Sequence, residues 1–266
     1  MRSLSASLSA GRSDTSGRSR PREVYAGLTM SPETVPPRAR PGPHPVACVR
    51  GADVDYAAGL RWQGEAMQAV RERGAEALAL IEHRPVYTMG RRGGRASLRT
   101  PPEELRASVV DVDRGGDITW HGPGQIVGYP VLGLRARGMA AADYVHALEA
   151  LLIEVLAAFD VSASVVAGRP GVWVDGAKVA AIGVAIRGGV SRHGFALNVV
   201  PDLSWFEDIV PCGIDDASVT SMARLLGHAP SMDAVVTATR RAFEARFDSV
   251  LHDAAPAWVD EEAVTA

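Results

Sequence analysis

Two residues of this chain have side chains that could cooperate in nucleophilic chemistry. Lys178 is the only lysine, although lysine and arginine together number 28. A guanidinium stays charged in proteins, whereas a buried ammonium can release its proton and act as a base. Cys212 lies between Pro211 and Gly213, a pattern typical of a sharp turn that a substrate can approach closely. Since a nearby ammonium lowers the pKa of a thiol, the two side chains are chemically compatible as a pair.

Each of these residues also has a purely structural interpretation. Lys178 lies in an apolar, strand-like segment and could be an ordinary residue at a strand end. Cys212 could be a thiol packed in a loop. The residue types alone leave both interpretations open.

Two histidines offer another partner for a cysteine. His121 lies in the segment 120–124 (WHGPG), and His193 precedes Gly194. Either could be the base of a Cys–His dyad. Each could equally be a loop histidine that hydrogen-bonds to the backbone. The other histidines show no ligand spacing with cysteines or acids, so we expect no metal site and no cofactor.

Two glycine-rich basic segments could hold a phosphate group. They are 91–95 (RRGGR) and 114–116 (RGG), and both could use backbone N–H groups and guanidinium side chains. Neither matches a P-loop or a dinucleotide-binding fingerprint. Flexible basic loops at a solvated rim would have the same composition.

Composition narrows the class of protein. The chain has 266 residues, is 47% hydrophobic and carries a formal net charge of -3, which argues against a general nucleic-acid or membrane-surface binder. No run of about 18 apolar residues occurs, so no membrane span is expected. Two distant cysteines favour neither a disulfide framework nor a zinc site. We therefore expect a cytoplasmic protein, with a monomer as the default state.

The chain is predicted to consist of one folded domain between two dissimilar ends. Residues 1–45 are rich in Ser, Arg and Pro and lack an apolar signal segment, although they also resemble an organellar transit peptide. We interpret them as a disordered leader, or as an extension upstream of a true start at Met30. The catalytic domain is expected at 46–251 and an acidic, loosely held tail at 252–266.

Short elements of mixed type must position the candidate residues. Asp175 and Gly176 predict a type I′ hairpin, after which Lys178 opens a returning strand at 178–187. Asp53 is expected to cap a helix that ends before Gly74. Other strands are predicted at 46–49, 77–81, 85–90, 109–113, 125–131, 161–166, 172–174 and 191–199. Other helices are predicted at 144–159, 218–226 and 231–247, with one helical turn at 204–208 and a loop at 115–124. This order favours an α+β fold with mixed β-sheets flanked by helices.

Several ordered segments together resemble the lipoyl(octanoyl) transferase family. They are 85–93 (PVYTMGRRG), 114–125 (RGGDITWHGPGQ), 171–174 (GVWV), 178–183 (KVAAIG), 193–198 (HGFALN) and 209–214 (IVPCGI). The resemblance spans residues 46–251, and the family often has Tyr where Trp120 stands. It implies the catalytic fold of biotin and lipoate protein ligases. It also implies that octanoyl is moved from acyl carrier protein to a lysine of a lipoyl-carrier domain, the first step of endogenous protein lipoylation.

The resemblance also implies roles for individual residues. Cys212 would be the nucleophile that carries the acyl thioester, and Lys178 would lower its pKa. The acceptors would be lipoyl-domain proteins such as the glycine cleavage H protein and 2-oxoacid dehydrogenase E2 subunits. The residues implied to bind the acyl substrate are Arg114, Gly115, Gly116, Asp117, Ile118, Thr119, Trp120, His121, Ala181, Ile182, Gly183, Gly194, Phe195 and Ala196.

Three other functions use some of the same features. An ATP-dependent lipoate or biotin protein ligase would share the fold and need no Cys212. A Cys–His thioesterase would pass the acyl group to water. A binding module for acylated proteins would show no turnover. The acceptor, and any requirement for ATP, separate these possibilities.

Overall fold

The structure, a computed structural model, describes residues 42–210 and 218–255. Almost all of the predicted leader, most of the predicted tail and Cys212 lie outside the described residues. In chain order the elements are β1 (His44–Val54), α1 (Tyr56–Arg73), β2 (Glu76–His83), β3 (Val86–Met89), η1 (Arg95–Ser97), η2 (Pro102–Glu104), β4 (Val109–Asp111), β5 (Ile118–His121), β6 (Gln125–Val131), α2 (Ala141–Ala157), β7 (Ser164–Val166), β8 (Arg169–Val174), β9 (Ala177–Arg187), β10 (Val190–Asn198), η3 (Leu203–Asp208), α3 (Met222–Leu226), α4 (Met232–Arg246) and β11 (Ser249–Asp253).

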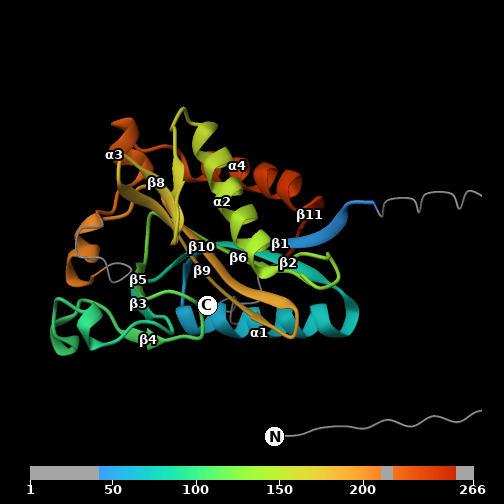
Figure 1. Ribbon diagram of the computed structural model, residues 1–266, viewed down its shortest axis with the longest axis horizontal. Helices are drawn as coiled ribbons and strands as arrows, with labels where there is room; N and C mark the ends of the chain where they lie inside the picture. The colour runs from blue at the N-terminus through green and yellow to red at the C-terminus, as the bar shows by residue number, and fades with distance from the viewer. Residues whose placement is uncertain (1–41, 211–217, 256–266) are drawn as a thin grey trace, which may run out of the picture. The chain divides into compact units, whose positions relative to one another are not determined.

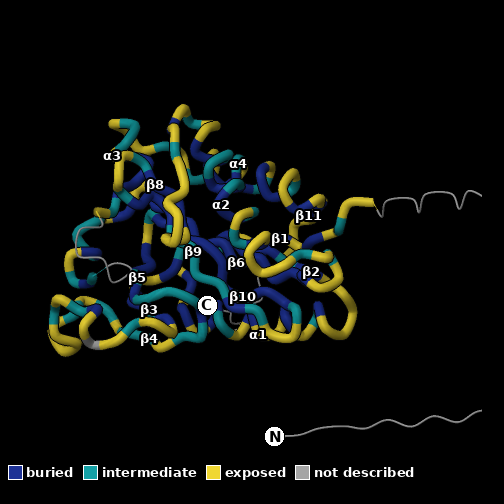
Figure 2. Tube along the Cα trace, in the orientation of Figure 1, coloured by how far each residue is buried: buried dark blue, intermediate teal, exposed yellow. Residues whose placement is uncertain are grey.

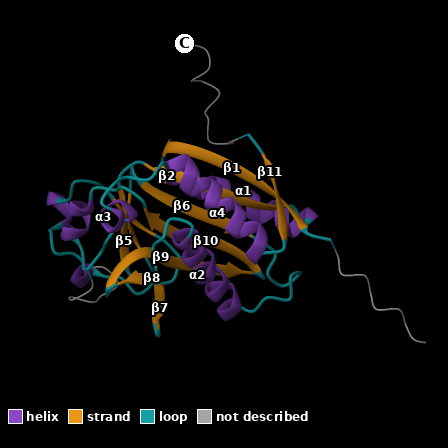
Figure 3. Cartoon of the chain, turned by 90° about the horizontal axis from the view of Figure 1, so that it is seen from above, coloured by secondary structure: helices purple, strands orange, loops and turns teal. Residues whose placement is uncertain are grey.

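An eight-stranded mixed sheet organises the described domain. Its strand order is β11-β1-β2-β6-β10-β9-β8-β7, and only the β11–β1 and β1–β2 pairs are parallel. Helix α1 covers one face, while α2 and α4 cover the other (Figure 1). Figure 3 shows the same layers from above. The predicted α+β class with mixed sheets is confirmed.

Each face of the large sheet has its own hydrophobic core. On the α2 and α4 face, the core includes Leu148, Phe195, Leu197 and Phe243, all at most 2% exposed. A smaller core lies against α1. Because the two faces are covered by different helices, the central strands are buried throughout (Figure 2).

A second, three-stranded sheet lies beside the central strands, with the order β4-β3-β5. It packs on η3 through the buried ring of Trp120, which stacks on Trp205 at 5.4 Å between centroids and meets Phe206 edge-on at 5.6 Å. The sequence predicted a loop at 115–124, but Ile118–His121 is strand β5, which pairs with β3. That part of the prediction was wrong, because β5 is short and its partner strand lies about 30 residues away in sequence.

The turn and helix-end residues that the sequence predicts have the backbone conformations expected for them. Asp175 and Gly176 both have positive φ, 49° and 79°, as the hairpin prediction requires. Gly74 ends α1 in the left-handed region, at φ 67°. The cap of α1 is Asp55 rather than Asp53, because β1 continues to Val54. Asp55 accepts hydrogen bonds from the N–H groups of the first turn.

The described strands extend past both predicted domain boundaries. β1 begins at His44, and β11 runs parallel to it as far as Asp253, so the two edges of the predicted domain lie side by side in the sheet. Helix α3 is also shorter than predicted, since it begins only after Ser221. Within the described ranges, no helix is both long and apolar enough to cross a membrane.

Candidate active site

A β-bulge decides where Lys178 points. The β8–β9 register pairs Gly171 with Ala181 and Val172 with Ala180, but Trp173 pairs with Lys178, so Val179 is an extra residue. Val179 and Ala180 are both fully buried in the α2-side core. Strict alternation would put Lys178 on that same face, whereas the bulge turns it to the opposite face. Bulges are common beside active sites for this reason.

The ammonium of Lys178 lies beside β8, close to the first residues of that strand. Its Nζ donates to the carbonyl of Pro170 at 3.2 Å and stands 4.7 Å from the centre of the Trp173 ring. The residue is only 6% exposed. Gly171 lies beside it, and a Cβ there would come within 3.4 Å of the lysine Cε. The side chain is therefore held in a defined place by backbone, ring and packing.

The main chain of Lys178 is fixed from a second direction. Its N–H donates to the carbonyl of Ser218 at 2.8 Å, and its carbonyl accepts from Thr220 at 3.0 Å. Val219 lies between these two bonds and forms a parallel bridge with Lys178. The chain segment that follows residues 211–217 is thus attached directly to the lysine strand.

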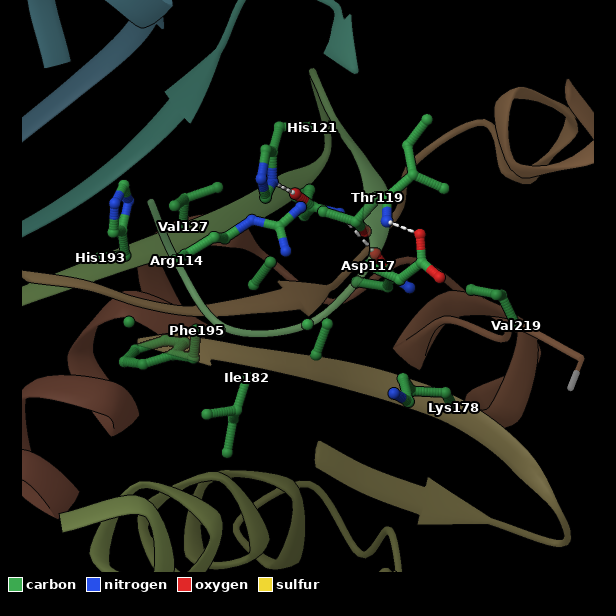
Figure 4. Close-up of a pocket in the computed structure, with 18 of the residues that line it drawn as sticks. Arg114, Asp117, Thr119, His121, Val127, Lys178, Ile182, His193, Phe195 and Val219 are labelled. Atoms are coloured by element: carbon green, nitrogen blue, oxygen red, sulfur yellow. Dashed lines mark hydrogen bonds between the residues drawn. The ribbon is translucent and has the colours of Figure 1, made fainter. Parts of the chain in front are cut away.

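A cavity of about 760 Å³ opens beside Lys178, between β5, β9, β10 and the first residue of α1. Twelve of the fourteen residues assigned to acyl binding line it (Figure 4). These are Arg114, Gly116, Asp117, Ile118, Thr119, His121, Ala181, Ile182, Gly183, Gly194, Phe195 and Ala196.

Two of the fourteen residues lie elsewhere. Trp120 is 1% exposed and packs on η3 rather than at the cavity. Gly115 binds the edge of β9, where its N–H donates to the carbonyl of Val184 at 2.9 Å. Cys212 belongs to the residues that the structure does not describe. Lys178, by contrast, lines the cavity together with most of the motif residues.

The floor of the cavity is made of residues with small side chains. Ala196 pairs with both Ala181 and Val127, and Gly194 pairs with Gly183. Directly paired residues share a face of a sheet, so these four small residues form one patch. Ile182 points to the other side of β9, toward α2, in Figure 4. The shortage of side-chain atoms on this face creates the space.

Arg114 forms a buried polar wall of the cavity. Its guanidinium donates to the hydroxyl of Thr88 at 2.8 Å and to the carbonyl of Gly115 at 3.1 Å, and the residue is 7% exposed. Gly90 allows the approach of the neighbouring loop, since a Cβ there would lie 2.5 Å from the Gly116 carbonyl. The arginine is therefore bound to the scaffold as well as facing the cavity.

A chain of hydrogen bonds links His121 to the lysine strand. His121 Nδ1 lies 2.7 Å from Gln125 Oε1, and the Gln125 amide donates to Asn198 at 2.9 Å. The Asn198 amide then donates to the carbonyl of Thr220 at 3.0 Å, and Thr220 holds Lys178. This chain positions the lysine strand from the opposite wall of the cavity.

Two histidines of the cavity lining, His121 and His193, and the neighbouring His83 are neutral at physiological pH. Burial lowers the pKa of His121 to about 3 and that of His83 to about 4. Burial also lowers the pKa of His193 to about 4, although its Nε2 lies 2.8 Å from the Asp113 carboxylate. The hydrogen bond to His193 thus fixes the side chain of Asp113, which precedes Arg114 in the sequence. No group of three His, Cys, Asp or Glu side chains suited to a metal occurs among the described residues.

Tyrosines close the cavity on the α1 side. Tyr56 is the first residue of α1, and its ring lies 6.2 Å from that of His121 in a stacked arrangement. The hydroxyl of Tyr129 lies 2.7 Å from His83 Nε2. Burial raises the pKa of Tyr56 to about 12, so its hydroxyl stays protonated. This end of the cavity is polar but uncharged.

Sequence reasoning missed eight residues of the lining as substrate-binding residues. Gln125, His193 and Asn198 lie in the quoted motifs and could have been found there. The other five come from separate elements and carry no recognisable pattern. They are Tyr56, Val127, Tyr129, Phe206 and Val219.

The chemistry open to this arrangement follows from its parts. An apolar chain fits over a floor of glycine and alanine, and neutral polar groups close the far wall. The amine of Lys178 lies in the cavity lining, and the backbone of Lys178 is bonded to the segment that begins at Ser218. Such a site can bind an acyl group and move a proton at one end of it.

Comparisons with known proteins agree with these features. Residues 55–244 match the family described as the lipoyl protein ligase A/B catalytic domain. An octanoyltransferase from Pelobacter propionicus is 45% identical over 199 residues, which cover 74% of this chain and 93% of the relative. An octanoyltransferase from Mycobacterium tuberculosis is 46% identical over 202 residues, covering 74% and 85%.

Solved structures resemble the fold at low sequence identity. A bipartite lipoate protein ligase from Thermoplasma acidophilum has a TM-score of 0.61 at 13% identity, covering 84% of this chain and 90% of its own. A lipoate-protein ligase A bound with ATP has a TM-score of 0.59 at 14% identity, covering 84% and 92%. These likenesses concern the fold alone, and they confirm the predicted fold of lipoate protein ligases.

Proposed function

The chain belongs to the lipoyl protein ligase A/B catalytic domain family and is an octanoyltransferase of protein lipoylation; we propose that it transfers octanoyl through a thioester on Cys212, with Lys178 as the proton carrier. The donor would be octanoyl-acyl carrier protein. The acceptor would be a lysine of a lipoyl-carrier domain, such as the glycine cleavage H protein or an E2 subunit of a 2-oxoacid dehydrogenase. The observation that carries the proposal is the buried side chain of the single lysine, which is held in the lining of the cavity together with most of the motif residues.

The attachment of the neighbouring chain supports Cys212 as the partner of this amine. Val210, two residues before Cys212, donates its N–H to the Ser97 carbonyl at 2.8 Å. Six residues after Cys212, Ser218 accepts the bond from the Lys178 N–H. The residues on both sides of 211–217 are therefore fixed by backbone hydrogen bonds, and on the Ser218 side the partner is Lys178 itself.

The first half-reaction exchanges one thioester for another. The Cys212 thiolate forms a bond to the octanoyl carbonyl carbon, and the bond from that carbon to the donor sulfur breaks. The Lys178 ammonium stabilises the thiolate and gives its proton to the departing thiol. The lysine is then neutral, as the second half-reaction requires.

The second half-reaction forms the amide. The acceptor amine attacks the octanoyl thioester and gives up a proton to Lys178, while Cys212 leaves as thiolate. The ammonium–thiolate pair is restored, so protons and charges balance over the cycle. General-base assistance of this type contributes about 10²–10⁴-fold in rate. The two titrations are best treated as those of a pair.

The lining residues would position the acyl chain and keep water from the thioester. Ala181, Ala196, Gly183 and Gly194 leave room for the chain on the sheet. Tyr56 and His121 close the other end, and the lowered pKa of His121 makes its imidazole a much weaker base than an ordinary histidine. Exclusion of water favours transfer to an amine over hydrolysis.

The test is the intact mass of the protein after incubation with octanoyl-acyl carrier protein. The wild-type chain should gain one octanoyl group, and a lipoyl domain should then remove it. Cys212→Ala should gain none. Cys48→Ala is the matched control and should keep the adduct, because Cys48 is 1% exposed and burial raises the pKa of its thiol.

Other outcomes would support the competing functions. Transfer that requires ATP and free octanoate would indicate a ligase. Loss of the adduct to water, with no acylated lipoyl domain, would indicate a thioesterase. An adduct that persists on Cys212→Ala would place the nucleophile elsewhere.

A further inference from the structure

A second cavity, of about 680 Å³, lies against the first. Four residues line both cavities: Gly116, Lys178, Ile182 and Gly183. The second cavity also reaches Val145 of α2 and the start of β8, so it opens on the α2 side of β9. Lys178 therefore lies where the two cavities meet, one on each side of the same strand.

The two cavities meet where strand pairing along the edge of β9 is interrupted, and we call this interruption the gap. The register of β8 with β9 extends only to Gly171 and Ala181. Farther along, Gly115 takes the place of a partner strand by donating to the carbonyl of Val184. The backbone between these two contacts is bordered by glycine: a Cβ on Gly183 would come within 3.0 Å of the Gly115 carbonyl.

The rim of the second cavity is positively charged. Its lining contains Arg92, Arg169 and Lys178 and no acidic side chain among the described residues. Arg92 and Arg169 are both exposed. Within residues 42–210 and 218–255, neither guanidinium has a carboxylate partner. This contrasts with the chain as a whole, whose formal net charge is -3.

Backbone contacts hold both arginines close to the junction. The N–H of Arg92 donates to the carbonyl of Gly116, a residue of both cavities, at 3.0 Å. The carbonyl of Arg169 accepts from the indole N–H of Trp173 at 3.2 Å, and the Trp173 ring lies under the Lys178 ammonium. The backbones of the two arginines are thus attached to residues at the junction, and both arginines line the second cavity.

We propose that the second cavity admits the pantetheine arm of the octanoyl donor, and that Arg92 and Arg169 bind the phosphate at the far end of that arm. The inference rests on the proposed function, in which the octanoyl group arrives as a thioester. The acyl chain would occupy the first cavity, the thioester would lie at Lys178 and the arm would leave through the gap. Guanidinium groups bind phosphate through paired, charge-assisted hydrogen bonds.

The same charges disfavour the acceptor at this opening. The acceptor reacts through a lysine, which brings a positive charge toward the site. The exposed guanidinium groups of Arg92 and Arg169 would repel that charge, whereas they attract a phosphodiester. A separate approach for donor and acceptor follows from this difference.

The experiment compares donors that differ only beyond the pantetheine arm. Arg92→Ala, Arg169→Ala and the double variant would be assayed with octanoyl-acyl carrier protein, octanoyl-coenzyme A and octanoyl-pantetheine, which has no phosphate. Each single variant should raise the KM for both phosphate-bearing donors about tenfold, since hydrogen bonds to charged groups contribute that much. With octanoyl-pantetheine, the ratio between wild type and variant should fall toward one.

The controls separate this inference from the proposed function. Arg61→Ala, an exposed arginine on α1, has the same change in charge and should behave as wild type with every donor. The KM for the lipoyl domain should not change in any variant. If the wild type transfers octanoyl from none of the donors, the proposed function fails rather than the phosphate site.

Three results would overturn the phosphate site. Equal losses with octanoyl-pantetheine would show that the arginines act on the acyl cavity. A higher KM for the lipoyl domain alone would assign the opening to the acceptor. A loss with the carrier protein but not with the coenzyme A donor would assign the arginines to the protein surface of the donor.

Discussion

The two faces of strands β9 and β10 differ sharply, although their residues alternate along the same backbone. The α2 face presents Leu197 and Ala180, both fully buried and part of the larger core. The opposite face presents glycine and alanine and leaves room for the cavity. The α2 face stabilises the sheet through a filled hydrophobic core, and the opposite face leaves space in which a substrate can bind. Substitutions on the two faces should therefore affect different measured quantities.

The largest effect is expected at Lys178, the residue that the bulge turns to the cavity face. Lys178→Arg keeps the positive charge but removes the base, because a guanidinium does not lose its proton in proteins. Turnover should fall about 10²–10⁴-fold, with the midpoint of thermal unfolding changed little. Steady-state transfer to a lipoyl domain measures this. Near-normal turnover would contradict the base assignment.

The next largest effect concerns the filled face. Leu197→Ala removes a fully buried side chain and should lower the free energy of unfolding by about 2–5 kcal/mol. Urea denaturation measures the change. The KM and kcat of the protein that remains folded should stay close to wild type, and a loss of turnover without a loss of stability would contradict the division between faces.

Two adjacent alanines allow a matched comparison of the faces. Ala180→Leu overfills the core and should destabilise the fold by about 1–3 kcal/mol. Ala181→Leu enters the cavity instead and should lower kcat/KM for octanoyl donors about tenfold, because one misplaced methylene in a pocket costs about 1–3 kcal/mol. Shorter acyl donors should lose less. Similar effects of the two variants on stability and on kcat/KM would remove the distinction.

The smallest effect is a pH dependence of the free energy of unfolding, which comes from buried histidines such as His83. The pKa of His83 is about 4 in the folded chain, against an ordinary value of 6.5. As the pH falls, the unfolded chain binds the proton first, so the contribution to stability is complete above about pH 6.5. It should decrease between pH 6.5 and 4 and then level off.

Urea denaturation at pH 7 and pH 5 tests this dependence. His83→Gln should reduce the loss of stability between the two values by about 1–2 kcal/mol, since each pKa unit corresponds to about 1.4 kcal/mol. His252→Gln, a substitution at an exposed position, is the control. An unchanged loss in His83→Gln would contradict the buried neutral state.

Much of the fold could be predicted because its signals are local. Positive φ at Asp175 and Gly176, the glycine that ends α1 and the caps Ser231 and Asp202 depend on a few neighbouring residues. β11 could not be predicted in this way. It is an edge strand with a polar sequence, and its parallel partner β1 lies about 200 residues earlier.

Residues of the candidate site could be predicted from the sequence only where they belong to recognisable motifs. The motif residues from Arg114 to His121 and from Lys178 to Ala196 mostly meet at one cavity. The face of Lys178 was not accessible, because the alternation of β9 is broken by a bulge without a glycine or proline to announce it. Trp120 was assigned to the substrate from its motif, yet tertiary packing directs its ring to η3. Tyr56 and Tyr129 come from elements with no chemical pattern of their own.

The bulge at Val179 also determines how β9 can tolerate changes in length. Successive side chains of a strand point to opposite faces, so the insertion or deletion of one residue between Lys178 and Ala181 moves the Lys178 side chain to the other face of the sheet. A change of two residues keeps the side chain on its face but shifts it along the strand by about 7 Å. A single deletion would therefore bury the amine in a hydrophobic core, and a double insertion would leave it in the correct direction but beyond the end of β8. The length of this short segment is as firmly constrained as the identity of its lysine.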